Sequence, residues 1–101
     1  MHVWEGTMQP KDGNIERTCE WWKSLLSLSG CEGFENGVAL NRMDGENSVL
    51  IIRHTFDDLA HEQRVWDTWN DSEVHKKIQA EWGEYCNGPV TVHRYYIQHS
   101  Y

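Results

Sequence analysis

Apolar and polar residues in the first part of the chain predict a strand followed by a helix. Residues 2–10, "HVWEGTMQP", are typical of a strand, and Pro10 with the turn residues "KDGN" ends it. Further along, apolar side chains recur three or four positions apart with charged residues between them, which is the period of a helix. These helical positions are Ile15, Cys19, Trp22, and Leu25 or Leu26.

Two strands joined by a tight turn are predicted next. The segment "SLSGCEG" breaks the helical pattern, and Gly30 is the expected helix stop. A second strand follows over residues 34–43, and "DGEN" is a turn of the kind that joins hairpin strands. The third strand, residues 48–56, is rich in β-branched residues and has the most regular strand pattern in the chain.

The C-terminal half repeats the order of helix and strand. Asp57 or Asp58 is expected to cap a helix by accepting hydrogen bonds from its free amides. Asp71 or Ser72 restarts the helical pattern, "NGP" closes it, and residues 90–98 alternate as a final strand. The apolar helical positions of this half are Leu59, Ala60, Val65, Trp66, Trp69, Val74, Ile78, Trp82 and Cys86.

The order strand, helix, strand, strand, helix, strand predicts one α+β domain over residues 1–101. Four antiparallel strands with the two helical regions on one face make a ferredoxin-like sheet. The other face carries enough Val, Ile and Tyr that leaving it in water would be costly, at about 25 cal/mol per Å². A second copy of the chain is the expected cover, so we expect a two-fold homodimer whose sheets pack face to face.

Composition narrows the class of protein. Sixteen acidic and nine basic residues give a formal net charge of −7, and the basic residues are dispersed, which argues against nucleic acid as a partner. No apolar run approaches the roughly 18 to 20 residues of a membrane span, and the N-terminus lacks the pattern of a secretory signal. We therefore expect a cytoplasmic protein that does not bind membranes.

The cysteines and histidines predict neither a disulfide framework nor a metal site. Cys19, Cys31 and Cys86 have no CxxC spacing, so reduced and buried thiols are expected. The six histidines lack the i, i+4 and HxH spacings of common metal sites. Six Trp are the unusual feature of the composition, and they either make the core very aromatic or line a cavity or an interface.

Four segments, in order, carry a family resemblance. They are "GCEGFENGVALNR", "DGENSVLIIRHTFDD", "WNDSEVH" and "GPVTVHRYYI". They are similar to the step into the second strand, the hairpin and third strand, the W-x-x-S-x-x-H motif and the closing strand of the antibiotic-biosynthesis monooxygenase group. Trp69, Ser72 and His75 fall on the motif positions. The resemblance covers nearly the whole chain and implies the dimeric α/β barrel fold of that group.

The same resemblance implies a cofactor-independent enzyme that oxygenates a hydrophobic, polyketide-type aromatic molecule. Such an enzyme deprotonates its substrate, holds the anion in a dry pocket between sheet and helices, and lets it pass an electron to O₂. His75 is the candidate base, with His54 and His93 as alternatives. The other implied roles are a stacking wall from Trp69 and Trp66, anion stabilisation by Arg53 or Arg94, orientation of a hydroxyl by Asn70 and Tyr95, and substrate contact by Trp4 and Trp22.

Each candidate also has a purely structural interpretation. Trp66 and Trp69 lie one helical turn apart and would anchor the helix in a core. His75 follows Ser72 at the spacing of a capping box, and a histidine on a strand is more often a satisfied sheet residue than a base. On the first helix Trp22 fits the apolar stripe, whereas its neighbour Trp21 is expected to be more exposed, where it could touch a partner.

Strand alternation sorts the third-strand candidates without orienting them. His54 shares a face with Ile52 and Phe56, and Arg53 shares the other face with Ile51. The pattern leaves open which of the two faces meets the helices.

Three further functions are weighed against oxygenation. A polyketide cyclase or isomerase would use the same base and pocket without oxygen, and a non-catalytic dimeric binding or stress-response module would fill the space with its own indoles. Haem degradation fits poorly, because Trp4, Glu5 and Gly6 stand where that branch has an Asn, and Gln79 stands where it has the iron-ligating His. A cavity of about 300 Å³ or more would favour an enzyme, and a solid core would favour the module.

Overall fold

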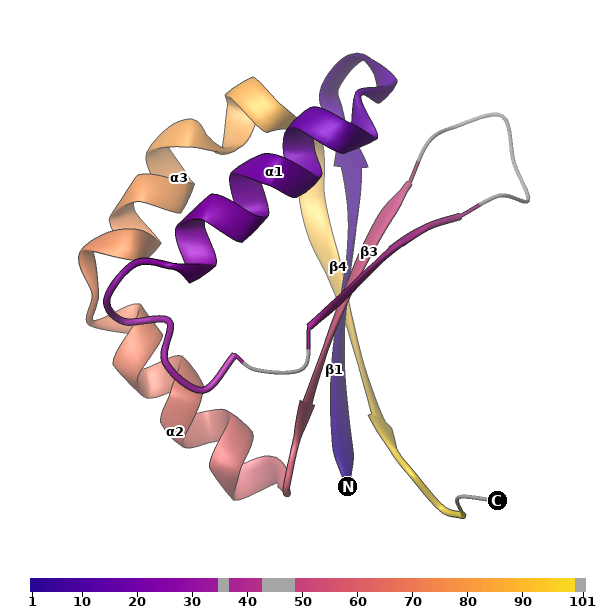
Figure 1. Ribbon diagram of the computed structural model, residues 1–101, viewed down its shortest axis with the longest axis vertical. Helices are drawn as coiled ribbons and strands as arrows, with labels where there is room; N and C mark the ends of the chain where they lie inside the picture. The colour runs from indigo at the N-terminus through magenta and orange to yellow at the C-terminus, as the bar shows by residue number, and fades with distance from the viewer. Residues whose placement is uncertain (35–36, 43–48, 100–101) are drawn as a thin grey trace.

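A sheet of four strands forms one layer of the protein and three helices form the other (Figure 1). This is seen in a computed structural model, which describes residues 1–34, 37–42 and 49–99. The strands are β1 (His2–Pro10), β2 (Val38–Asn41), β3 (Leu50–Phe56) and β4 (Cys86–Tyr96). The helices are α1 (Ile15–Leu26), α2 (Leu59–Asn70) and α3 (Glu73–Tyr85), and a 3₁₀ turn, η1 (Lys11–Gly13), follows β1.

The sheet has the order β2-β3-β1-β4, and each pair of neighbours is antiparallel. All the helices lie on one face of it (Figure 1). This is the ferredoxin-like α+β arrangement, so the predicted fold class is confirmed. None of the described helices has the length and apolar character needed to cross a bilayer.

The helix starts follow the expected capping chemistry. The Asn14 side chain accepts a hydrogen bond from the amide of Arg17 at 3.1 Å, and α1 begins at the next residue after Asn14. At α2 the capping residue is Asp58, which accepts from the amide of His61 at 2.7 Å, so of the two predicted aspartates the second is the cap.

Two helix boundaries differ from the prediction. α1 ends at Leu26, four positions before Gly30, because its last turn is already closed by local bonds such as the one from the amide of Leu28 to the Leu25 carbonyl. α3 ends at Tyr85, before the predicted stop at residues 87–89. The predicted restart at Asp71 or Ser72 is confirmed, because α2 ends at Asn70 and α3 begins at Glu73. There the Ser72 hydroxyl donates to the Trp69 carbonyl at 2.6 Å, closing α2 rather than capping α3.

The strands differ mainly in length. The second strand occupies only Val38–Asn41 of the predicted 34–43, and the predicted "DGEN" turn lies outside the described residues. β4 begins at Cys86, directly after α3, instead of at residue 90. The long β4 pairs with β1 along almost its whole length. One side of β4 contacts α2 through Arg94, and Gly88 of β4 accepts a hydrogen bond from Trp82 of α3.

Contacts between β1 and α2 show which side chains of the sheet face the helices. Trp4 of β1 packs against Trp66 of α2, and its partners in register, His54 and Arg94, therefore face the helices as well. The next position, Glu5, is paired with Arg53 on β3 and His93 on β4, and these side chains face away from the helices.

The prediction that Trp21 is more exposed than Trp22 is wrong. Trp21 is only 5% exposed, and its ring stacks on Tyr85 of α3 at a centroid distance of 4.6 Å. Trp22, one position on, points into the main core. Helix α1 is covered on two sides, by the sheet and by α3, so adjacent tryptophans on different sides of the helix are both buried.

Candidate functional site

A cavity of about 220 Å³ lies between the sheet and the helices, and most of its wall is tryptophan. We call it the indole cavity. Four tryptophans that the sequence proposed as site residues, on β1, α1 and α2, meet here. Met8 of β1 and residues of α3 and β4 complete the wall. The cavity is lined by Trp4, Met8, Trp22, Trp66, Trp69, Ile78, Trp82, Val90 and Val92.

Ring packing fixes much of this wall. The Trp66 ring lies 5.1 Å from that of Trp4 and 5.2 Å from that of Trp69, the second pair at 90°. Gly6 makes room for Trp4, because a Cβ at Gly6 would lie 2.6 Å from the Trp4 ring. On α3 the indole N–H of Trp82 donates to the Gly88 carbonyl at 2.7 Å, which fixes that ring.

A second cavity of about 190 Å³ lies between α1 and the β2–β3 side of the sheet. We call it the histidine cavity, because His54 forms part of its wall. His54 is buried, and its ring centroid lies 6.1 Å from that of Trp4 and 5.2 Å from that of Phe34. The residues around this cavity are Cys19, Trp22, Lys23, Leu26, Gly37, Val38, Ala39, Ile52 and His54.

The size of these cavities bears on what they can hold. An apolar protein cavity of about 150 Å³ is large enough for benzene, whereas typical small-molecule sites begin near ~300 Å³. Each cavity is smaller than the ~300 Å³ that would favour an enzyme, but each has room for a ligand of one or two aromatic rings. A third space, bounded by Trp22, Leu25, Phe34 and Trp66, is filled by the side chains themselves.

His75 reaches the indole cavity only through Trp69. The imidazole stacks on the Trp69 ring at 4.6 Å and 28°, and its Nδ1 lies 3.3 Å from the backbone oxygen of Asn70. His75 is not among the side chains that line either cavity. Its contacts are with the end of α2, and it does not form the capping box with Ser72 that its spacing suggested. The Asn70 side chain is exposed.

Three other predicted site residues lie on the far side of the sheet. Arg53 donates through Nε to Glu5 at 2.9 Å, His93 is opposite Glu5 in the β1–β4 register, and Tyr95 stacks with His93 at 6.4 Å. These side chains are separated from the indole cavity by the sheet itself. The expectation that they share one pocket with the tryptophans is therefore corrected by the structure, because alternation along β3 and β4 turns them away from the helices.

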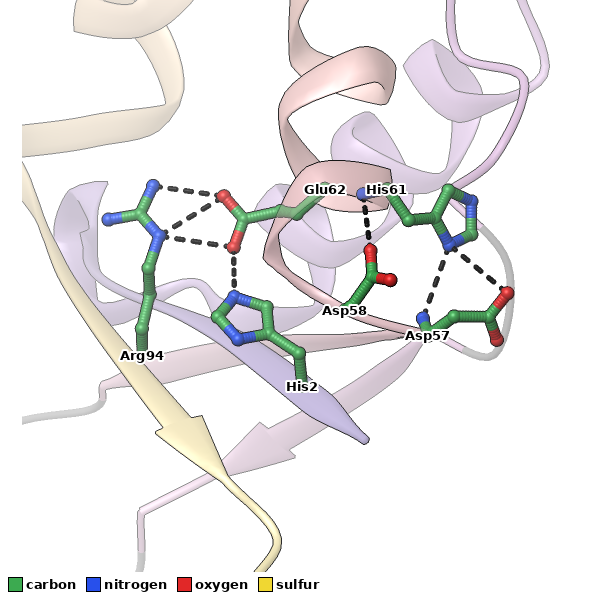
Figure 2. Close-up of polar contacts among 6 residues, drawn as sticks. All are labelled: His2, Asp57, Asp58, His61, Glu62 and Arg94. Carbon is green, nitrogen blue, oxygen red and sulfur yellow. Dashed lines mark hydrogen bonds and ion pairs between the residues drawn. The ribbon is translucent and has the colours of Figure 1, made fainter.

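His2, Glu62 and Arg94 form a buried ionic cluster that the sequence analysis did not predict. Glu62 of α2 is 1% exposed; its carboxylate accepts hydrogen bonds from Arg94 Nε and Nη2 of β4 at 3.0–3.1 Å and lies 2.5 Å from His2 Nε2 of β1. Figure 2 shows both partners converging on it, beside the Asp57, Asp58 and His61 contacts at the start of α2. Burial raises the pKa of the Glu62 carboxyl, but the hydrogen bonds and charges of Arg94 and His2 outweigh burial and hold this pKa below its ordinary value.

The cluster lies next to the indole cavity. His2 is the helix-facing position before Trp4 on β1, Arg94 is the one after Val92 on β4, and Glu62 is one turn before Trp66 on α2. The signal that would have found it is the position of Glu62. It shares a helix face with Trp66 and Trp69, at i+4 and i+7, where an unpaired charge would not be tolerated.

The cysteines are reduced. All three are free, Cys31 and Cys86 are buried, and Cys19 is half-buried at the histidine cavity. Burial raises the pKa of the Cys86 thiol to about 11, and burial together with the nearby Glu32 raises that of Cys31 to about 11. These two thiols are therefore protonated near neutral pH and are poor nucleophiles.

The fold and cavities together define a ferredoxin-like α+β protein with an aromatic space between sheet and helices. SnoaB, a cofactor-independent oxygenase from Streptomyces nogalater, is similar with a TM-score of 0.61 and 11% identity, over 98% of this chain and 94% of that one. A NIPSNAP domain protein from Burkholderia xenovorans has a TM-score of 0.73 and 9% identity, over 95% and 93%. A NIPSNAP family protein from Agrobacterium tumefaciens has a TM-score of 0.68 and 9% identity, over 94% and 90%.

These similarities establish a shared fold. It is the ferredoxin-like α+β fold that the sequence predicted. No family model matches the chain, and no curated protein matches it in sequence.

Proposed function

We propose that the protein binds a hydrophobic aromatic small molecule between sheet and helices and oxygenates it without a cofactor. The observation that carries this proposal is the indole cavity, in which Trp4, Trp22, Trp66 and Trp69 come together around free space. Apolar walls of this kind bind aromatic rings and exclude water, and the fold is shared with a cofactor-independent oxygenase.

Cofactor-independent oxygenation requires a base that deprotonates the substrate, and the resulting substrate anion then reacts with O₂. Of the three candidate bases, His54 is the one that lines a cavity, so it is the residue we propose to accept the substrate proton. The anion then gives one electron to O₂, and the radical pair combines to a peroxide. Loss of water leaves one oxygen atom in the product, as in the conversion of anthrone and O₂ to anthraquinone and water.

Oxygen uptake with 1-naphthol and with anthrone tests the proposal. With anthrone, which is large enough to reach His54 from the indole cavity, we expect uptake of one O₂ per substrate, label from ¹⁸O₂ in the product, and a rate lowered about 10²- to 10⁴-fold by His54→Gln, the usual value of a positioned base. 1-Naphthol bound in the indole cavity alone does not reach His54, so its oxygen uptake should be much slower. His75→Gln is the comparison, because His75 only stacks on Trp69 and should change the rate much less. Binding of both substrates without any uptake would rule out oxygenation, and a larger effect at His75 would reassign the base.

Two other functions use the same site. A cyclase or isomerase would need the base and the aromatic wall but no oxygen, so product formation under strict anaerobiosis would select it. A non-catalytic binding module is favoured by one specific observation, the filled space between Trp22, Leu25, Phe34 and Trp66. For that module, titration with 1-naphthol or anthrone would show saturable binding, and no product would form in air or under argon.

We also propose that the chain forms a homodimer through the helix-free face of the sheet. Tyr95 of β4 is 48% exposed on this face and Ile51 of β3 is half-buried, and the Glu5–Arg53 ion pair links β1 to β3 on the same face. A second copy would cover these apolar groups, and removing their surface from water would favour association.

Light scattering coupled to gel filtration is expected to give twice the mass of the chain. Tyr95→Glu, which puts a charge on the covered face, should give the mass of a single chain. Leu28→Glu is the matched control, because Leu28 is also an exposed apolar residue but follows α1 on the helical side. A single-chain mass for the parent protein would contradict the dimer.

A further inference from the structure

We infer that Trp22 is a partition between the indole cavity and the histidine cavity, and that its displacement joins them and so sets the size of ring system that the site accepts. This inference rests on the proposed binding of an aromatic ligand. It assigns to Trp22 a role in determining which ligands bind. It also explains why His54 and the aromatic wall lie in separate cavities, since the Trp22 ring stands between them.

The two cavities differ in chemistry and share one wall. The indole cavity is lined by apolar side chains only, whereas the histidine cavity includes His54 and Lys23. Trp22, on α1, lines both. A ligand that stacks on Trp4 and Trp66 and also reaches His54 must therefore pass the position that the Trp22 ring now occupies.

The Trp22 ring is held by packing alone. It is 8% exposed, and its indole N–H has no hydrogen-bond acceptor within the described part of the chain. The Trp82 ring on the opposite wall is different, because its N–H is bonded to the Gly88 carbonyl. Moving Trp22 breaks no hydrogen bond, and a ligand oxygen could provide the acceptor that the buried N–H lacks, which is a gain rather than a loss.

The volumes set the expected selectivity. Cavities of about 190 and 220 Å³ each exceed the roughly 150 Å³ that holds benzene, so a two-ring ligand fits one of them with Trp22 in place. A three-ring ligand needs space from both cavities and binds only after Trp22 has moved. Trp22 therefore weakens the binding of three-ring ligands and leaves two-ring ligands almost unaffected.

The test is calorimetric titration of the parent protein and of Trp22→Phe with 1-naphthol and with anthrone. Trp22→Phe shortens the partition, so anthrone should bind at least about tenfold more tightly than to the parent, the size of effect that small volume changes have in apolar pockets. Affinity for 1-naphthol should change less than about threefold, well below that pocket effect. Trp22→Leu, followed by thermal melting, gives a second partition variant if the first is poorly folded.

Trp21→Phe is the matched control. Trp21 is the neighbouring residue on the same helix, is also buried and also has an indole N–H without an acceptor in the described residues, but it lines neither cavity. It should leave the ratio of the two affinities unchanged. Equal changes for both ligands in Trp22→Phe, or the same selectivity change in Trp21→Phe, would overturn the partition. Failure of every protein to bind either ligand would instead remove the proposed function.

Discussion

Replacement of Arg94 by methionine is expected to lower the free energy of unfolding by about 3–5 kcal/mol, the usual cost of leaving one charge of a buried ion pair without its partner. Methionine keeps most of the apolar stem of Arg94 but removes all three hydrogen bonds to Glu62. The Glu62 carboxylate then has only the His2 ring as a partner and cannot reach water from its buried position, so most of its desolvation cost is no longer offset. Urea unfolding at pH 7 measures the loss.

Glu62→Gln is the informative comparison, because the two partners differ in exposure. The Arg94 side chain is 48% exposed and can turn its charge to water when Glu62 is neutral. Glu62→Gln should therefore cost less than Arg94→Met, and adding it to Arg94→Met should recover part of the loss. Equal costs for the two single variants, or simple addition in the double variant, would contradict a buried, coupled cluster.

The cluster also predicts a dependence of stability on pH. The pKa of Glu62 is lower in the folded protein than its ordinary 4.5, so the folded state binds this proton less readily than the unfolded chain. Its contribution to stability is complete above the ordinary value and is lost as the pH falls through the lower, folded pKa. In Arg94→Met the Glu62 pKa should be higher than in the parent, because burial raises it and Arg94 no longer lowers it. Acidification toward pH 5 should therefore reduce the difference in the free energy of unfolding between Arg94→Met and the parent protein.

Trp4→Ala is expected to be the second large effect, at about 3–5 kcal/mol, as for other buried aromatic truncations. Trp4 is buried, lies over Gly6 and packs on Trp66, so its loss opens a void in the core. For a domain of this size, the melting temperature should fall on the order of 15 °C or more. Thermal unfolding followed by circular dichroism gives the value.

Trp69→Ala distinguishes the contribution of the Trp69 ring to stability from its contribution to ligand binding. Trp69 is half-buried, so its removal should cost about 1–3 kcal/mol, less than that of Trp4, since less apolar surface is lost. It nevertheless lines the indole cavity, and affinity for 1-naphthol should fall in this variant while the fold persists. If Trp69→Ala destabilises the protein as much as Trp4→Ala and binds naphthol like the parent, Trp69 is a core residue only.

The fold could be predicted because its signals are local. The strand at residues 2–10 and the helix from Ile15 follow from periodicity, and Asp58 caps α2 through contacts three residues away. Trp21 could not be placed in the same way. Its burial depends on α3, which returns along α1 and brings Tyr85 onto the ring from 64 positions away in the sequence.

The candidate site was predictable only in part, for the same reason. Clustered tryptophans indicated an aromatic space, and Trp4, Trp22, Trp66 and Trp69 do line one. Alternation separated His54 from Arg53, but only contacts across the layers show that His54 faces the helices and Arg53 does not.

Glu62 was overlooked because a charged residue on a helix is usually solvated. Its partners, His2 and Arg94, lie at opposite ends of the chain and meet it only in the fold. Long-range polar contacts of this kind leave no periodic pattern in the sequence.

A crystal structure of the protein with 1-naphthol tests the central claim, that the indoles of β1, α1, α2 and α3 enclose a site for an aromatic ring. We predict the naphthol ring between Trp4, Trp66 and Trp69 on the helical side of the sheet. Naphthol bound only on the surface, with these three rings packed against one another and no space between them, would contradict it.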